Sequence, residues 1–229
     1  MISIITPIYD IESHLDDFLD LALAISKSRE RKNTVKEIIL INNNIRVDLP
    51  NLISFRPYLP LLKVVQNKKN VGYGRACNQG MKLAAGDEML ILNPDIRVGM
   101  DDLEELLTFL KKTPAAHIVG CKLFNADGSL QNSCRTFPTL RALLARRISL
   151  FRTLFKKSLD HYDLASYDHN EVRKVDWISG AFMLLRKKYP FDERLVWMQG
   201  EDIEWSSRIC DHWKYLFNPK AIVRSLKMK

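Results

Sequence analysis

The segment from Asn70 to Asp95 constrains the fold of this 229-residue chain more than any other. Gly72 lies in a glycine-rich turn, where glycine permits a positive φ and close backbone approach. Residues 78–85 suit a helix, and Gly86 is placed to close it. Residues 88–92 form a short, continuous apolar run, which predicts a strand that is buried on both faces.

Asn93, Pro94 and Asp95 follow the predicted strand directly. Proline cannot donate to a strand ladder, so the strand is expected to end there. In open α/β sheets, ligands bind outside the carboxyl ends of the strands, which is where Asp95 would lie. On residue chemistry alone, an ordinary turn aspartate explains this position as well as a binding site does.

The same alternation of strand and helix continues along the chain. A β-rich run covers residues 2–10, and its strand is expected to end at Pro7. Further strands are expected over residues 37–41, 61–65 and 116–120. A helix should begin at Ser13 with a capping box to Asp16, and another should cover residues 101–111. This pattern predicts an α/β fold with a parallel sheet and a nucleotide-binding crevice.

The segment from Asn70 to Asp95 resembles the inverting nucleotide-sugar glycosyltransferases of family 2, and especially their rhamnosyltransferase-like branch. The shared pattern is N-x-G-[FY]-[GA]-x-[AG]-x-N-x-G followed, after a spacer, by L-N-P-D. It is carried here by Asn70, Gly72, Tyr73, Gly74, Arg75, Ala76, Asn78, Gly80, Leu92, Asn93, Pro94 and Asp95. The likeness extends from Ile2 to about Val223. It implies a single GT-A domain with a Rossmann-like, mostly parallel central sheet flanked by helices. Residues 1–120 would form its nucleotide-sugar half and residues 121–229 its acceptor and catalytic half.

A second group of residues resembles the W-x-x-G-A, F-D-E and E-D segments of the family, in that order. Trp177, Gly180 and Ala181 carry the first segment, which implies an acceptor or sugar pocket. In the third segment, Asp202 falls on the position of the catalytic base, with Glu201 beside it. An inverting transfer needs a base to activate the acceptor hydroxyl. Without the resemblance, helix capping is the commoner explanation for a single acid in a first helical turn.

The resemblance also implies a set of donor contacts at strand ends and in the glycine-rich turn. They are Thr6, Pro7, Tyr9, Asp10, Asn42, Asn43, Asn70, Gly72, Arg75, Asn78, Asn93, Pro94 and Arg224. Asn42 replaces an aspartate that usually accepts from the base. An amide oxygen still accepts a hydrogen bond, but without the charge that strengthens it. The run of three asparagines also suits a plain turn.

Asp95 is the metal ligand that the resemblance implies, for Mn²⁺ or Mg²⁺. Such cations use few protein carboxylates together with phosphate oxygens. Many relatives add a late histidine, and Arg224 stands at that position here. Arginine does not ligate a cation but pairs with phosphate, so the expected metal dependence is weak or altered.

The segment 139–157 is strongly basic. Its cations lie, with Arg135, in a stretch that has no acidic residue, and they are Arg141, Arg146, Arg147, Arg152, Lys156 and Lys157. Leu140, Leu144, Ile148, Phe151 and Phe155 would share one face of a continuous helix. This pattern predicts an interfacial helix on an anionic membrane, with a helix packed on the domain as the open alternative. No nucleic-acid motif accompanies the net charge of +8, so no nucleic-acid partner is expected.

Composition supports a cytoplasmic protein. The chain is 46% hydrophobic and 27% charged, as globular domains are, and it contains no apolar run long enough for a spanning helix. The N-terminus lacks the features of a signal peptide. The cysteines Cys77, Cys121, Cys134 and Cys210 are scattered, which predicts reduced thiols.

Together these observations predict an inverting hexosyl- or deoxyhexosyltransferase of surface-polysaccharide biosynthesis. It would move a sugar from a nucleotide-diphosphate donor to a glycan or lipid-linked glycan acceptor, in the cytoplasm or peripherally on the inner face of the cytoplasmic membrane. A catalytically silent sugar-nucleotide-binding or scaffolding domain of the same fold is the alternative. Donor, acceptor and linkage depend on the shape of the pocket, which the sequence does not give.

Overall fold

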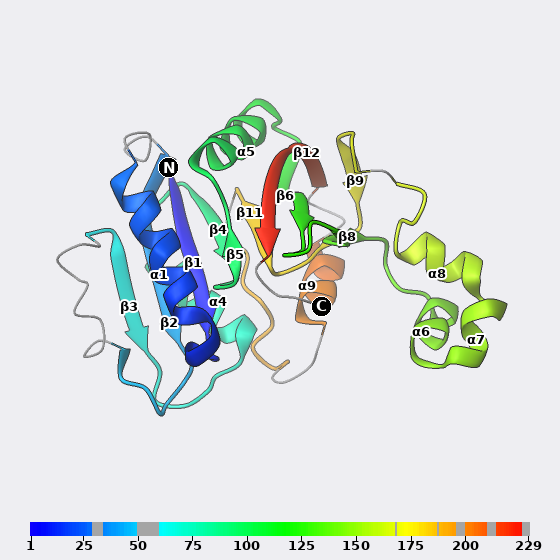
Figure 1. Cartoon of the computed structure of the whole chain (residues 1–229), viewed down its shortest axis with the longest axis horizontal. Helices are drawn as coiled ribbons and strands as arrows, with labels where there is room; N and C mark the ends of the chain where they lie inside the picture. The colour runs from blue at the N-terminus through cyan, green and yellow to red at the C-terminus, as the bar shows by residue number, and fades with distance from the viewer. Residues whose placement is uncertain are drawn as a thin grey trace.

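The computed structural model describes residues 1–28, 34–49, 60–167, 169–186, 188–195, 200–209 and 214–225. Helices flank a central sheet in these residues (Figure 1). The N-terminal part of the sheet is parallel. Its strands are, in spatial order, β3 (Leu62–Gln66), β2 (Val35–Asn42), β1 (Ile2–Ile8) and β4 (Glu88–Leu92).

The C-terminal part of the sheet is mixed. It continues from β4 with β11 (Phe182–Leu185), β6 (Ala116–Phe124), β12 (Lys214–Ser225) and β5 (Ile96–Arg97). β11 runs antiparallel to both of its neighbours, whereas β6 and β12 are parallel. Two short strands extend this sheet, β7 (Leu130–Gln131) beside β6 and β9 (Arg173–Val175) beside β12, while β8 (Cys134–Arg135) and β10 (Trp177–Ile178) pair separately. The predicted α/β fold, with a mostly parallel central sheet and flanking helices in a single domain, is confirmed.

Helices bury both faces of the sheet because successive strand side chains point to opposite faces. Ile4 belongs to a core cluster with residues of α1 (Ile11–Lys27) and α5 (Met100–Lys112). Its neighbour Ile5 belongs to the second cluster, with residues of α4 (Tyr73–Leu83) and α9 (Glu201–Ile209). α4 and α9 therefore pack on the same side of the sheet.

The first strand and helix differ from the prediction in two places. β1 continues through Pro7, which lies opposite Ile41 of β2. Its ladder with β4 ends at Ile5, so Pro7 has a strand neighbour on one side only and its missing N–H is tolerated there. The following helix begins two residues before Ser13, and the carboxylate of Asp10 caps it by accepting from the Ser13 N–H at 3.3 Å.

The glycine-rich turn has the backbone that its sequence predicts, but the helix after it begins earlier. Gly72 has a φ of +87° and is the N-cap of α4, which runs on to Leu83. Gly86 does not close the helix. A Cβ at Gly86 would lie 2.6 Å from the Met1 carbonyl oxygen, so glycine is required there for close packing against β1.

The basic segment forms a lobe of three short helices rather than one long helix. They are α6 (Leu140–Arg147), α7 (Ser149–Leu154) and α8 (Lys156–Tyr162), named here together as the helical lobe. Ile148 is extended and Phe155 is non-helical, so the single apolar face predicted over this segment does not exist. Figure 1 places the helical lobe at the end of the molecule opposite β3.

Within the described ranges, every helix is too short or too polar to cross a membrane. Cys77, Cys121 and Cys134 are buried free thiols, and Cys210 lies outside the described residues.

Candidate functional site

Amide side chains connect the carboxyl ends of β2 and β3 to α4. The Asn43 Oδ1 accepts from the Asn67 Nδ2 at 2.8 Å, and Asn67 also exchanges hydrogen bonds with Gln79 of α4 at 2.9 Å. The Asn43 Nδ2 donates to the Gly72 carbonyl oxygen at 3.4 Å. This network holds the glycine-rich turn against the strand ends. Neither Asn67 nor Gln79 was predicted as a site residue, although Gln79 lies within the glycine-rich motif.

Asn42 is fully buried, and its amide is used within the turn. Its Nδ2 donates to the Val47 carbonyl oxygen at 2.9 Å and to the Gln66 Oε1 at 2.7 Å. Its Oδ1 accepts from the Asn44 N–H at 2.8 Å. These contacts support the plain-turn interpretation of Asn42 over direct recognition of a base.

The residues at the end of β1 differ in exposure. The ring of Tyr9 is 60% exposed. Thr6 is buried, and its Oγ1 has no hydrogen-bond partner among the described residues. Because Asp10 is occupied in capping α1, Tyr9 is the side chain of this group that is free to stack on a ligand.

The residues of the glycine-rich motif brace the two halves of the protein. The Asn70 Oδ1 accepts from the Gly72 N–H at 2.9 Å. The Asn78 Oδ1 accepts from the Phe191 N–H at 2.8 Å, and its Nδ2 donates to the Phe191 carbonyl oxygen at 3.0 Å. The Arg75 Nε donates to the Glu193 carbonyl oxygen at 2.8 Å. Asn78 and Arg75 therefore fix α4 to the chain around residue 191.

The Asn93–Pro94–Asp95 turn lies beside the Gly180–Ala181 turn. β4 and β11 are antiparallel, with Leu92 opposite Phe182, and the Asn93 N–H donates to the Ala181 carbonyl oxygen at 3.0 Å. Two motifs that are far apart in the sequence thus meet at one end of the sheet.

Asp95 is 3% exposed and leads into β5. β5 pairs with β12, which sets the backbone of Arg224 opposite Arg97, two residues beyond Asp95. In the described part of the chain, no three histidine, cysteine, aspartate or glutamate side chains gather into a group that could hold a metal ion. A single buried carboxylate at a strand end fits a cation that is held mainly by phosphate oxygens, rather than one enclosed by side chains.

Asp202 lies in the first turn of α9, against the Gly180–Ala181 turn. Its Oδ2 accepts from the Gly180 N–H at 3.3 Å, and its Oδ1 accepts from the Ile203 N–H at 3.0 Å. Burial raises the pKa of this carboxyl above its usual range, although the backbone N–H groups oppose the rise. The neighbouring Glu201 accepts from the Gly200 N–H at 3.2 Å.

Tyr73 contacts this turn, and Trp177 lies three residues before Gly180 in the chain. The Tyr73 hydroxyl donates to the Gly180 carbonyl oxygen at 2.6 Å, so α4 and α9 hold the same glycine. Tyr73 belongs to the glycine-rich motif, but no role was predicted for it. Trp177 is buried under the helical lobe, and its Nε1 donates to the Thr136 carbonyl oxygen at 2.9 Å. Its place in an acceptor or sugar pocket stays a prediction.

Contacts thus run from the Asn93–Asp95 turn through Ala181 and Gly180 to the carboxylate of Asp202. One end of this arrangement offers a buried acid at a strand terminus, suited to a cation or phosphate site. The other end offers a carboxylate with a raised pKa, suited to proton transfer.

Comparisons with known proteins identify the family and the fold. The family model described as Glycosyl transferase family 2 matches residues 3–175. An N-acetylglucosaminyl-diphospho-decaprenol L-rhamnosyltransferase of Mycobacterium tuberculosis is 25% identical to this chain over 242 residues, which cover 97% of the chain and 75% of the relative.

Solved structures share the fold at low sequence identity. Residues 1–349 of S. aureus TarS match with a TM-score of 0.62 and 15% identity, and the match covers 98% of this chain and 60% of that fragment. The mannosyltransferase PcManGT from Pyrobaculum calidifontis, in complex with GDP-Man and Mn²⁺, matches with a TM-score of 0.61 and 15% identity over all of this chain and 57% of its own. The chain therefore belongs to glycosyl transferase family 2 and is a glycosyltransferase with the GT-A fold.

Proposed function

We propose that this protein transfers a hexosyl or deoxyhexosyl group, with inversion, from a nucleotide-diphosphate sugar to a lipid-linked glycan of a surface polysaccharide. The observation that carries the proposal is the placement of Asp202 against Gly180, one residue from the Ala181 carbonyl that contacts Asn93. Asp202, the proposed base, and the Asn93–Asp95 strand end, which would face the donor phosphates, then lie on either side of the Gly180–Ala181 turn. The mycobacterial relative, whose name specifies a diphospho-decaprenol acceptor, supports a lipid-linked acceptor.

In this proposal the ionised Asp202 takes the proton of an acceptor hydroxyl as its oxygen attacks the anomeric carbon of the donor. The bond from that carbon to the phosphate oxygen breaks, and the nucleoside diphosphate leaves from the opposite face. Burial raises the pKa of Asp202, and a carboxylate with a raised pKa is the stronger base. The backbone N–H groups of Gly180 and Ile203 hold the carboxylate in place.

The nucleotide half of the domain, residues 1–120, would hold the donor at the strand ends. Tyr9 offers an exposed ring for stacking on the base. Asn43 and Gly72 shape the neighbouring turn, and Asp95 would hold a divalent cation together with the donor phosphates. Such a cation offsets the charge that develops on the leaving diphosphate.

Two variants test this assignment in different assays. Asp202→Asn should bind UDP, dTDP or GDP as the wild type does, while sugar transfer falls by roughly 10²-fold or more, the usual scale of general base catalysis. Asp95→Asn should weaken metal-supported nucleotide binding as well as turnover. Thermal shift reports nucleotide binding, because a ligand specific for the native state stabilises it, and product formation over a panel of nucleotide sugars reports transfer.

An Asp202→Asn variant that transfers sugar at the wild-type rate would contradict the base assignment and leave Glu201 as the next candidate. Donor binding by the wild type without transfer or donor hydrolysis, over a broad acceptor panel, would favour the silent-domain alternative.

We also propose that the helical lobe lies on an anionic membrane surface. Leu140, Leu150 and Leu154 are 73%, 78% and 69% exposed. Exposed cations of the same helices surround them (Arg141, Arg146, Arg147, Arg152, Lys156 and Lys157). Apolar side chains that enter the headgroup region and cations that pair with anionic lipid are the two elements of interfacial binding.

A further inference from the structure

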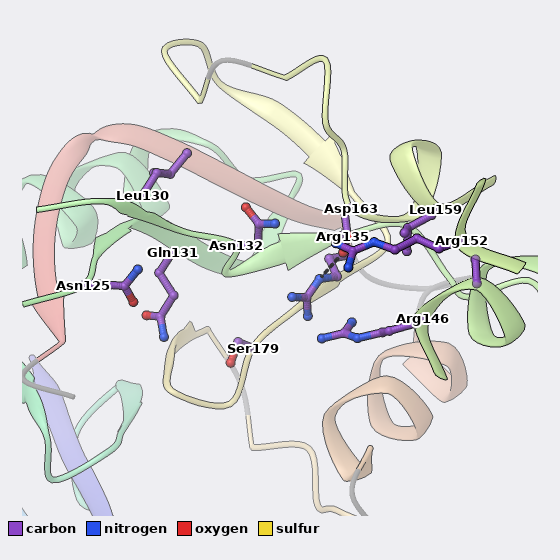
Figure 2. Close-up of a pocket in the computed structure, with 11 residues that line it drawn as sticks. Asn125, Leu130, Gln131, Asn132, Arg135, Arg146, Arg152, Leu159, Asp163 and Ser179 are labelled. Carbon is purple, nitrogen blue, oxygen red and sulfur yellow. Dashed lines mark hydrogen bonds and ion pairs between the residues drawn. The ribbon is translucent and has the colours of Figure 1, made fainter. Parts of the chain in front are cut away.

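Three arginines that the site above does not use converge on a cavity between the helical lobe and the sheet. The cavity measures about 530 Å³ and is open to solvent. Figure 2 shows Arg135 from β8, Arg146 from α6 and Arg152 from α7 directed toward the same space. On its other side the wall consists of Asn125, Leu130, Gln131, Asn132 and Ser179.

The cavity carries uncompensated positive charge. Arg135 forms an ion pair with Asp163 at 3.0 Å, and Asp163 is the acid that lines the cavity. Among the described residues, Arg146 and Arg152 form no ion pair, and Arg146 lies over the ring of Tyr162 at 5.8 Å. Two guanidinium groups are thus left to pair with an anion, and the planar guanidinium matches phosphate oxygens in a bidentate manner.

Arg135 is held rigidly at the back of this cavity. Its guanidinium lies 5.3 Å from the ring centre of Trp177 and 5.6 Å from that of Tyr162. Such stacking together with the ion pair fixes the group before a ligand arrives, which reduces the entropy lost on binding. The arrangement is therefore that of a prepared anion site, whereas cations on an ordinary solvated surface keep their side-chain freedom.

The amide wall of the cavity adjoins the Gly180–Ala181 turn directly. Ser179 lines the cavity, precedes Gly180, and accepts from the Ala181 N–H through its Oγ at 3.3 Å. Gln131 lies in the same wall, and its buried Oε1 has no hydrogen-bond partner among the described residues. Buried polar atoms are normally paired, and hydroxyl groups of a bound sugar would be suitable donors at this wall.

The cavity and the helix beside it therefore offer three chemical environments. Ser179, which precedes Gly180, lies in the amide and hydroxyl wall, guanidinium groups stand on the other side, and the exposed Leu150 and Leu154 lie on the same helix as Arg152. A sugar, a phosphate group and an apolar chain occur in this order in a glycan linked through phosphate to a lipid. Ser179 joins the cavity to the Gly180–Ala181 turn, which contacts Asp202. A ligand in the cavity would therefore lie close to the proposed base, as a substrate must and bulk membrane lipid need not.

We infer that Arg146 and Arg152, with Arg135 behind them, bind the phosphate or diphosphate of a lipid-linked acceptor, an inference that rests on the proposed function. Their role would be to position the acceptor sugar beside Asp202. The donor diphosphate would bind elsewhere, at the strand ends around Asp95.

Two double variants with equal loss of charge test the inference. R146Q/R152Q changes the cavity, whereas R141Q/R147Q changes exposed arginines of α6 that do not line it. The probe is geranyl diphosphate, titrated calorimetrically into the full chain. R146Q/R152Q should weaken its binding by about tenfold or more for each guanidinium lost, the scale of charge-assisted hydrogen bonds. R141Q/R147Q should change it by no more than about twofold, as exposed charges do.

Comparing two ligands and the two double variants distinguishes the possible sources of the anion. Inorganic pyrophosphate should bind more weakly than geranyl diphosphate, and equal affinity would overturn the lipid-linked assignment in favour of free diphosphate. An equal loss of geranyl diphosphate affinity in both double variants would overturn the cavity assignment and leave a cationic membrane surface.

The two proposals fail separately. Wild-type affinity of R146Q/R152Q for geranyl diphosphate overturns this inference and leaves the role of Asp202 intact. Absence of any stabilisation of the wild type by UDP, dTDP or GDP contradicts the proposed function instead. In steady-state transfer, R146Q/R152Q should raise the KM for a diphosphate-linked acceptor and leave the KM for the nucleotide sugar unchanged.

Discussion

At the scale of single residues, Asp202 has a carboxylate whose charge its surroundings disfavour. Burial raises the pKa of this group above its ordinary value. A base acts only when ionised, so transfer should increase as the pH rises through that raised pKa. We expect the acid limb of kcat/KM to lie above the ordinary aspartate range, and to be lost from the residual activity of Asp202→Asn. An acid limb within the ordinary aspartate pKa range would contradict the claim that burial raises the pKa of Asp202.

The same shift predicts the sign of the effect on stability. Ionised Asp202 is less favourable in the folded than in the unfolded protein, so its contribution lowers the free energy of unfolding as the pH rises from the ordinary to the raised pKa. Asp202→Asn removes this cost. Its melting temperature at pH 7 should equal or exceed that of the wild type, and a clear decrease would indicate that the carboxylate is needed for folding.

At the scale of elements, the helical lobe presents apolar side chains to solvent. Leu150 and Leu154 of α7 are among the most exposed apolar residues described. Replacing both with serine should reduce retention on vesicles of anionic phospholipid, because less apolar surface enters the interface. Leu83→Ser, at a half-exposed leucine of α4, is the matched control and should not change retention. Co-flotation with vesicles at low and high salt measures the effect.

Salt should release the wild type from these vesicles, since exposed charges are screened. Equal retention on neutral vesicles, or retention that the two serines leave unchanged, would assign the helical lobe to another partner.

The sequence predicts elements best where a hydrophobic run ends in polar residues. The strand at residues 88–92 has the predicted bounds because it is buried throughout and followed by Pro94. The breaks at Ile148 and Phe155 could not be predicted, because neither residue is a helix breaker and tertiary packing imposes the turns. In the site, Asp202 and Gly180 were named from their motif. The arginine cavity was missed, since Asn125, Arg146 and Ser179 meet only after folding.

At the scale of the whole molecule, Asn78 joins the part of the chain before residue 121 to the part after it. Asn78 is buried, and both the oxygen and the nitrogen of its side-chain amide form hydrogen bonds with the backbone of Phe191. Asn78→Ala leaves the Phe191 N–H and carbonyl without their partner, which should lower the free energy of unfolding by about 1–3 kcal/mol. Urea denaturation measures this loss. A large fall in nucleotide affinity at unchanged stability would instead make Asn78 a direct donor contact.

The chain leaves β8 for the helical lobe and comes back through β9, at the edge of the large sheet, to β10, which pairs with β8. Arg135 at the end of β8 lies opposite Trp177 of β10, so the chain departs and comes back between paired strands. A segment whose ends are already held together can be exchanged for one of different length or sequence at little entropic cost to the rest of the fold. Grafting the corresponding segment of a relative between β8 and β9 would then replace the acceptor-facing surface while the strand ends around Asp95 stay as they are. Under the proposed function, such an exchange would change the glycan acceptor and leave the sugar donor the same.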